Sequence, residues 1–270
     1  MNWRYTFLVI LLISVPAWSQ TTPPATNSYL FPLFADGSSN GTTYRSSVRI
    51  LPIATTTPSM TCTFSQTQTN FSFVGINGTS YPAGYSLNTF ENMTASNPII
   101  LDGYQPLEVL TSQNTTQAAL QTGYAAVSCP QPVHTELTIA TFDSKGNKLS
   151  ETAVEPATLG VSFEFVVDTR DGTSLAFSLV NNSAVVGEYQ VIARDEYGRI
   201  AAAQVAPQIN AYSQVSVFAS QILNLPANFY GTIEVIGVNG GSSYAVGLQY
   251  TGSIFSIVIP TVRNAPIGSF

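Results

Sequence analysis

Residues 107–127 read LEVLTSQNTTQAALQTGYAAV, and residues 215–235, 108 positions later, read VSVFASQILNLPANFYGTIEV. Six of the 21 aligned positions carry the same residue, and Gly123 with Gly231 and Val127 with Val235 are among them. The repetition therefore suggests that the chain contains two copies of one structural unit.

The match extends upstream at a different offset. A shift of 129 places VRILP (48–52) on FSLVN (177–181) and MTCTF (60–64) on YQVIA (189–193), with apolar positions on apolar positions. The two offsets differ by 21, so the first copy carries about 21 extra residues. We place this insertion at about 65–106.

The predicted domain organisation follows from these offsets. We expect a first unit at 28–158, which contains the insertion, and a second unit at 159–270. A chance similarity at this level of identity is the alternative. We expect residues 1–19 to be a signal peptide and residues 20–27 to be a linker.

Most segments of both units read as short strands, because β-branched and aromatic residues alternate with polar ones. These segments are 44–53, 59–66, 134–142, 162–168, 174–180, 187–195, 232–238, 244–250 and 254–260. Asp143 and Asp195 each stand three residues before a glycine, which is typical of a turn between paired strands. Residues 215–223 have apolar side chains at helical spacing and predict one helical turn. The fold class is therefore all-β, with two tandem Ig-like β-sandwich domains related by an internal repeat.

The beginning of the chain has the pattern of a secretory signal. Arg4 precedes an apolar run from Phe7 to Val15, and small residues lead to Ser19. A retained membrane anchor is the alternative, but the run is about half of the ~20 residues that a spanning helix needs. We expect cleavage near Ser19 and a secreted or cell-surface protein without a membrane span.

The composition is that of a folded, acidic protein. Only 9% of residues are charged and 44% are hydrophobic, which is the opposite of a disordered chain. Without Arg4, 15 acidic residues face eight of the nine basic ones. This balance repels phosphate backbones, so nucleic acid is not an expected partner.

The chain has two cysteines, Cys62 and Cys129. In an exported protein we expect them to form a disulfide, with two free buried thiols as the alternative. In the repeat alignment their counterparts are Val191 and Gly237. The second unit would then lack this link.

Several segments resemble repeated β-sandwich modules of uncharacterised secreted proteins of acidobacterial type. FPLFADGSSNGTTYRSSVRILP (31–52) resembles their F-P-x-F-A-D-G opening, and residues 123–157 resemble their G-W/Y-A-x-V segment with its later L-S-E-x-x-V-P-A motif. The second unit fits through LAFSLVNNS (175–183), RDEYGRIAA (194–202) and YAVGLQYTGSIFSIVIP (244–260). The resemblance implies a fold and an exported setting, and it assigns no functional residue.

Candidate catalytic and metal sites are sparse in the sequence. His134 is the one histidine, no G-x-S-x-G motif is present, and we interpret His134 as a solvated strand residue. Asp168 with Asp171, and Asp36 with Asn40, offer too few ligands for a calcium loop and read as turns. We therefore expect no metal, no cofactor and no catalytic residue.

The insertion is the most distinctive segment for binding. Tyr81, Tyr85 and Phe90 lie among Asn, Gly and Ser residues, a composition similar to recognition surfaces. The alternative is a long hairpin whose aromatic rings cover the edge or the core of the sandwich. On the first interpretation these three residues form a binding surface for carbohydrate or another surface protein.

The sequence does not specify one function. We expect a non-catalytic secreted or cell-surface protein with a structural, adhesive or binding role. An extracellular, glycosidase-like hydrolase that uses paired carboxylates is the alternative from another class. Fold alone does not choose between them.

Overall fold

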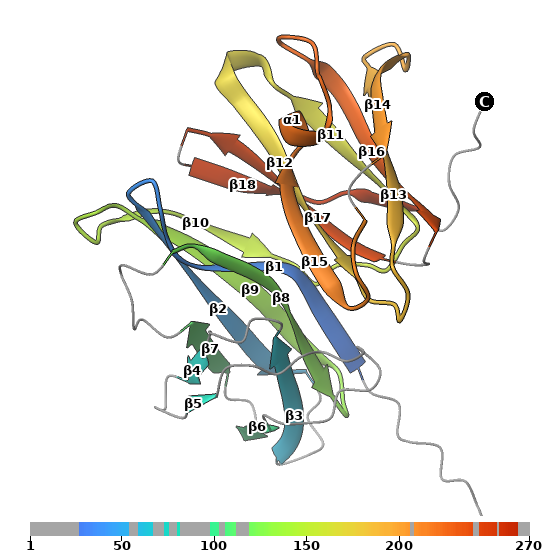
Figure 1. Cartoon of the computed structure of the whole chain (residues 1–270). Coiled ribbons are helices and arrows are strands. Elements are labelled where there is room, and N and C mark those ends of the chain that lie inside the picture. Colours follow the sequence, from blue (N-terminus) through green and yellow to red (C-terminus); the bar gives the residue numbers. More distant parts are fainter. Residues whose placement is uncertain are drawn as a thin grey trace, which may run out of the picture.

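A computed structural model shows an all-β protein in which two β-sheet bodies follow one another along the chain (Figure 1). We call β1–β10 the first half and β11–β19 the second half. The described residues are 27–53, 59–66, 73–75, 80–81, 98–102, 106–111, 119–205, 208–239, 243–252 and 254–263. The predicted signal peptide and nearly all of the predicted linker lie outside these residues.

The described residues of the first half form ten strands. Their bounds are β1 (Asn27–Ser39), β2 (Thr42–Pro52), β3 (Ser59–Gln66), β4 (Phe73–Gly75), β5 (Ser80–Tyr81), β6 (Pro98–Asp102), β7 (Leu107–Thr111), β8 (Gln121–Cys129), β9 (Val133–Phe142) and β10 (Lys148–Val154). The long strand β1 pairs with β8 and then, at Gly37–Ser39, with β2. It therefore belongs to both layers of the sandwich.

In the second half, the part of the chain that the structure describes forms nine strands and two short helices. Their bounds are β11 (Ser162–Asp168), the 3-10 turn η1 (Arg170–Gly172), β12 (Thr173–Asn181), β13 (Glu188–Asp195), β14 (Ile200–Val205), β15 (Ser213–Phe218), α1 (Ala219–Ile222), β16 (Tyr230–Asn239), β17 (Ser243–Thr251), β18 (Ile254–Val258) and β19 (Thr261–Arg263). They form one sheet in the order β14-β13-β16-β11-β19 and another in the order β15-β12-β17-β18. The predicted helical turn is confirmed only at Ala219–Ile222, because residues 213–218 pair as a strand with β12.

The two halves pair their strands in the same pattern. In the first half β8 joins β1 to β3, and β3 pairs with β6; in the second half β16 joins β11 to β13, and β13 pairs with β14. The other layer runs β7-β2-β9-β10 in one half and β15-β12-β17-β18 in the other. Among the described residues, no strand of one half pairs with a strand of the other.

The cross-strand registers test the two offsets read from the sequence. Val48 faces Val109 in the first half, and Phe177 faces Val217 in the second. Phe177 lies 129 residues after Val48, and Val217 lies 108 residues after Val109. On the neighbouring strands, however, Phe64 faces Val127 whereas Val191 faces Val235. The pairing of Val48 with Val109 therefore agrees with both offsets. On β3 and β8 the offset of 108 is kept from Val127 to Val235, but the offset from Phe64 to Val191 is 127 and not 129.

In the strand pairing, Tyr189 and not Val191 therefore holds the position relative to β16 that Cys62 holds relative to β8. The alignment missed this because a shift of two residues along a strand leaves every side chain on the same face. Tyr189 lies opposite Gly237, which occupies the place of Cys129. In the second half this pair of positions thus holds a tyrosine and a glycine, and no disulfide.

The predicted disulfide is confirmed. Cys62 on β3 and Cys129 on β8 are bonded, and their Cα atoms are 4.3 Å apart. Both side chains are buried in the core of the first half, together with Phe64 and Val127. The bond closes a loop of 67 residues, so it restricts the unfolded chain strongly.

The two predicted Asp-Gly turns are also confirmed. The Asp143 carboxylate accepts hydrogen bonds from the backbone N–H groups of Lys145 and Asn147, both at 2.8 Å. Asp195 accepts those of Tyr197 and Arg199 in the same way. Gly146 and Gly198 close these turns with φ of 84° and 77°, which a residue with a Cβ atom rarely adopts.

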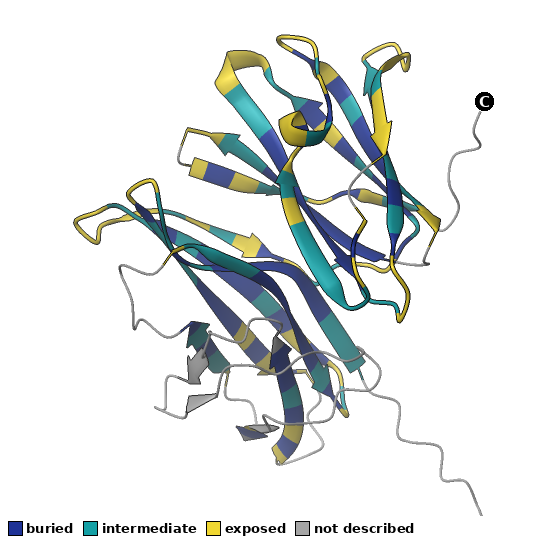
Figure 2. Cartoon of the chain, viewed as in Figure 1, coloured by how far each residue is buried: buried dark blue, intermediate teal, exposed yellow. Residues whose placement is uncertain are grey.

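A buried interface joins the two halves. The outer face of β1 and β8 contributes Leu30, Tyr124 and Ala126, and it packs on Val180 of β12 and Tyr244 of β17. As a result β8, β12 and β17 are buried on both faces over most of their length (Figure 2). The protein therefore buries apolar surface between its halves as well as within each of them.

Polar groups at this interface are paired across it. The Ser178 hydroxyl donates to the carbonyl oxygen of Pro32 at 2.7 Å, and the Tyr124 hydroxyl donates to that of Tyr212 at 3.1 Å. Beside the interface, the backbone N–H of Ala157, in the segment that connects the halves, donates to the carbonyl of Leu30 at 2.8 Å. An unpaired buried polar group costs about 1–3 kcal/mol, so these bonds fix how the halves meet.

Removal of the disulfide should destabilise the protein. We expect Cys62→Ala/Cys129→Ala to lower the free energy of unfolding by about 2–4 kcal/mol, because the unfolded chain regains the freedom of the closed loop. Urea unfolding followed by intrinsic fluorescence measures this, with Thr61→Ala on the exposed side of β3 as the control. Equal unfolding free energies for the oxidised protein and the double variant, or two alkylatable thiols in native protein, would contradict the assignment.

Candidate functional site

A cleft of about 280 Å³ lies between the two halves. Side chains from β1, β2, β8 and β9 form one wall, and side chains from β12, β15, β17 and β18 form the other. The lining residues are Leu33, Ala35, Tyr44, Leu120, Thr122, Ile139, Ala176, Ser216, Val217, Phe218, Leu248, Tyr250 and Phe255. Interfaces between domains are preferred places for ligand sites.

Four aromatic rings follow one another through this cleft. Tyr44 of the first half stacks near Phe255 of β18, with ring centroids 6.5 Å apart and planes inclined by 24°. Phe255 contacts Tyr250 at 5.4 Å, and Tyr250 contacts Phe218 at 5.3 Å. The row of rings therefore begins on one half and continues on the other.

The cleft is electrically neutral. None of its lining side chains is Asp, Glu, Lys, Arg or His. Burial raises the pKa of Tyr44, and burial together with the nearby Tyr44 raises the pKa of Tyr250 to about 12. Both phenols therefore stay protonated at neutral pH and can donate hydrogen bonds. Thr122 and Ser216 add two aliphatic hydroxyl groups.

Asp36 is an ionisable residue next in sequence to a residue that lines the cleft. It follows the lining residue Ala35, and its Oδ1 accepts a hydrogen bond from the Thr111 hydroxyl at 3.2 Å. Burial raises the Asp36 pKa to about 6, although the hydrogen bond from Thr111 acts in the opposite direction. Asn40, with which Asp36 was considered as a calcium ligand, instead adopts φ of 51° in the β1–β2 turn.

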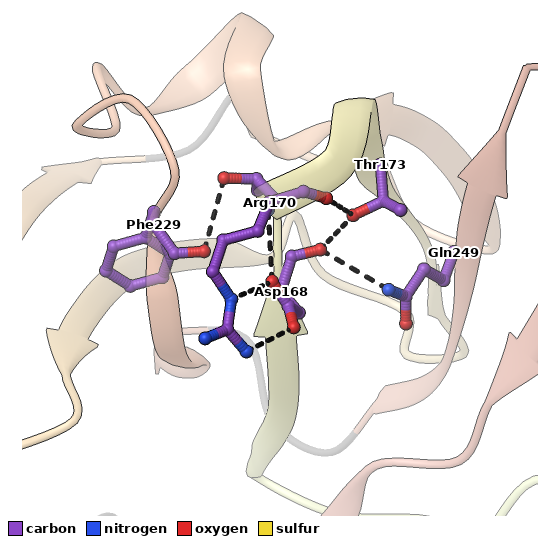
Figure 3. A network of polar contacts seen from close by, with 6 residues as sticks. Asp168, Arg170, Thr173, Phe229 and Gln249 are labelled. Carbon is purple, nitrogen blue, oxygen red and sulfur yellow. Dashed lines mark hydrogen bonds and ion pairs between the residues drawn. The ribbon is translucent and has the colours of Figure 1, made fainter.

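The second acidic pair also serves a turn. Both carboxylate oxygens of Asp168 bind Arg170, through Nε at 2.8 Å and the terminal nitrogen at 2.6 Å (Figure 3). The Asp168 carbonyl accepts hydrogen bonds from Thr173 and Gln249. These contacts occupy Asp168, and the hydrogen bonds from Arg170 lower its pKa to about 2. Asp171 lies in the same turn with φ of 58°.

No group of three or more His, Cys, Asp or Glu side chains that could hold a metal ion occurs within the described parts of the chain. His134 is exposed on β9, opposite Leu51, and the prediction that it is a solvated strand residue is confirmed. It borders an open hollow with Arg49 and Glu136. Arg49 forms ion pairs with Glu108 at 3.2 Å and with Glu136 at 3.9 Å. Arg49 therefore lies between the two carboxylates. They do not face each other across an open space, as the paired carboxylates of a glycosidase would.

A second neighbouring pair of carboxylates is inaccessible. Glu164 and Glu234 face each other on β11 and β16. Glu234 is 1% exposed and accepts a hydrogen bond from the Ser162 hydroxyl, and Glu164 forms an ion pair with Arg263. A sugar ring cannot reach Glu234, so this pair does not favour a glycosidase.

The predicted binding surface of the insertion is not described by the structure. Tyr85 and Phe90 lie outside the described residues. Of Tyr81 only the backbone is placed, in β5, where it lies opposite Phe73 of β4. Strand β4 pairs with β7 and extends that layer by a short hairpin with β5. Strand β6 lies within the predicted insertion but pairs with β3 as β14 pairs with β13. Within the described residues, the additional content is thus the hairpin β4–β5.

The cleft between the halves was not predicted from the sequence. Lining residues such as Tyr44, Tyr250 and Phe255 lie on predicted strands, but the apolar outer faces of those strands were not interpreted as an interface. Leu33, Ala35 and Thr122 lie outside the strand segments predicted from alternation, and residues 216–218 were expected in a helical turn. The available signal was the near-continuous apolar run, as in LAFSLV (175–180) and YAVGL (244–248), since strands buried on both faces lose the alternating pattern.

Comparison with known proteins adds no assignment. No known protein-family model matches the chain, and no curated protein is significantly similar to it. No helix among the described residues has the length and apolar character needed to cross a membrane. Functional inference must therefore come from the site itself.

Asp36 should make the stability of the protein depend on pH. The folded-state pKa of Asp36, about 6, is above the ordinary value of 3.8. The stability of the fold with Asp36 protonated is therefore fully present below pH 4 and is lost as pH rises through 6 and the carboxyl group ionises. We expect Asp36→Asn to raise the free energy of unfolding at pH 7.5 by on the order of 1 kcal/mol, after allowance for solvent screening. The gain should vanish at pH 4.

Urea unfolding at several values between pH 4 and pH 7.5 tests this expectation. Asp143→Asn is the matched control, because hydrogen bonds from Asn147 lower the pKa of that exposed carboxylate. Its replacement should give no gain as pH rises from 5 to 7.5. A pH-independent effect of Asp36→Asn would show that burial does not disfavour the charged form.

Proposed function

We propose that this chain is an exported, non-catalytic binding protein that holds a ligand in the cleft between its two halves. The observation that carries this proposal is a neutral cleft of about 280 Å³ lined by aromatic rings from both halves. Such a lining excludes water and offers hydroxyl donors to a bound molecule. It provides no carboxylate, imidazole or amine for proton transfer within the cleft.

The proposal includes two tandem Ig-like β-sandwich domains, at 28–158 and 159–270, that arose by duplication. The shared strand-pairing pattern supports this, and so do the offsets kept at Val48–Val109 and Phe177–Val217. Duplication also accounts for the binding geometry, because a pair of similar sandwiches creates an interface that one sandwich lacks.

Export is supported by the predicted signal peptide and by the disulfide. A bonded Cys62–Cys129 pair is typical of an oxidising compartment. We propose that the mature chain is secreted or attached to the cell surface, in agreement with the resemblance to exported β-sandwich modules. Carbohydrate or another surface protein remains the proposed partner of the insertion at Tyr81, Tyr85 and Phe90.

Blocking the cleft tests the binding role. Ser216 is an exposed lining residue, so Ser216→Trp places an indole ring in the cleft without a change in the core. We expect this variant to lose, by at least tenfold, the affinity that wild type shows in a thermal-shift screen of varied small molecules. Gln204→Trp, on the exposed strand β14, is the matched control and should bind as wild type does.

The same set of proteins on a glycan and cell-wall array separates the cleft from the insertion. Tyr81→Ala/Tyr85→Ala should weaken only contacts made by the insertion. Hits that Ser216→Trp retains at full affinity would move the site away from the cleft. Turnover of a glycoside substrate by wild type would favour the hydrolase instead.

A further inference from the structure

The chemistry of the cleft restricts its ligand more narrowly than binding alone does. Nine of the thirteen lining side chains are apolar, and the other four, Tyr44, Thr122, Ser216 and Tyr250, carry only hydroxyl groups. Ligand pockets commonly combine such an apolar lining with a few orienting polar groups. We infer that the cleft binds an uncharged, ring-containing apolar small molecule with one or two hydrogen-bonding groups. This inference rests on the proposed function.

Charged ligands are disfavoured by what surrounds them. An ion in the cleft would exchange water for aliphatic and aromatic side chains, and no lining residue carries a compensating charge. The hydroxyl groups of Tyr44 and Tyr250 are neutral, so they cannot supply one. A neutral molecule loses much less hydration on entry.

Sugars are also disfavoured in this cleft. A saccharide presents several hydroxyl groups on each ring, and burial leaves each unpaired one at a cost of about 1–3 kcal/mol. The four hydroxyl groups of the lining are spread over both walls, on β2, β8, β15 and β17. An apolar ring with a single phenol, ketone or amine-type group needs only one or two such partners. We therefore assign carbohydrate, if bound, to another surface.

The aromatic row favours a ring over an extended chain. The four rings, Tyr44, Phe255, Tyr250 and Phe218, stand in contact with tilts of 24° to 51°. Flat ligand rings stack on such faces or meet their edges with favourable electrostatics. Since Tyr44 belongs to one half and the other three to the second, the ligand would contact both halves at once.

The size of the cleft limits the ligand to one small molecule. Its volume of about 280 Å³ lies just below the roughly 300–1,000 Å³ range of ligand pockets. A two-ring or three-ring compound is of this order, whereas a polymer segment is not. Ligand contacts with both walls should also stabilise the interface, because a ligand that binds only the folded state raises the unfolding temperature.

Two fluorescent probes with one skeleton test the ligand class. N-phenyl-1-naphthylamine is neutral, and 1-anilinonaphthalene-8-sulfonate is the same molecule with an added sulfonate. We titrate each into the mature, disulfide-bonded protein and follow the emission. We expect saturable binding of the neutral probe at one site, at least tenfold tighter than that of the sulfonate, and a higher melting temperature in its presence.

Variants on both walls locate this binding. Ser216→Trp from β15 and Thr122→Phe from β8 each fill the cleft, and both should weaken the neutral probe at least tenfold. Gln204→Trp should leave its affinity unchanged. Two independent blocking variants keep the test decisive if one of them folds poorly, which circular dichroism would reveal.

The possible failures are distinguishable. If the sulfonate binds as tightly as the neutral probe and both blocking variants lose it, the ligand class is wrong but the cleft is still a binding site. If blocked and wild-type proteins bind the neutral probe equally, the cleft is not its site. If wild type does not bind the neutral probe at all, the inference is overturned, and hits of other chemistry in the thermal-shift screen decide the proposed function separately.

Discussion

Burial of both faces of three strands is the constraint on which the arrangement of this protein depends. Strands β8, β12 and β17 use one face for the core of their own half and the other face for the opposite half. Burial of apolar surface contributes about 25 cal/mol per Å². Burial of the second face, against the opposite half, therefore adds to the stability that each half gains from its own core. Paired polar contacts such as Ser178 to Pro32 then select one orientation of the halves.

The cleft is a consequence of this contact. Two twisted sheets that meet along β1, β8, β12 and β17 cannot remain in contact along their whole length, because each twists away from the other. Close packing is reached around Tyr124 and Val180, while the region around Tyr44, Tyr250 and Phe255 keeps an open volume. The same interface thus provides both the fixed geometry of the protein and the place where a ligand can contact both halves.

The halves share a pattern of pairing but differ in how they stabilise it. The first half connects β3 to β8 by a disulfide. In the second half Tyr189 lies opposite Gly237 in the strand register, and its hydroxyl bonds that of Ser243. Gly231, which repeats Gly123, is required sterically, since a Cβ atom there would lie 2.0 Å from the carbonyl oxygen of Arg194. This steric constraint is a physical reason for a glycine at that position of β16.

The sequence by itself determined many of the strands, the Asp-Gly turns and the disulfide, because alternation, turn chemistry and the pairing of two cysteines in an exported chain are local or compositional properties. Strand β1 was not among the segments predicted from alternation, and residues 215–218 of β15 were expected in a helical turn. The sequence placed β3 and β11 at the residues observed. Its two offsets also agree with the pairing of Val48 with Val109 and of Phe177 with Val217. Tertiary structure alone decided that Cys62 corresponds to Tyr189, since a shift of two residues is invisible to a pattern of period two. It also decided the cleft, because Tyr44 and Phe255 are 211 positions apart in the chain and only the packing of one half on the other brings their rings within 6.5 Å.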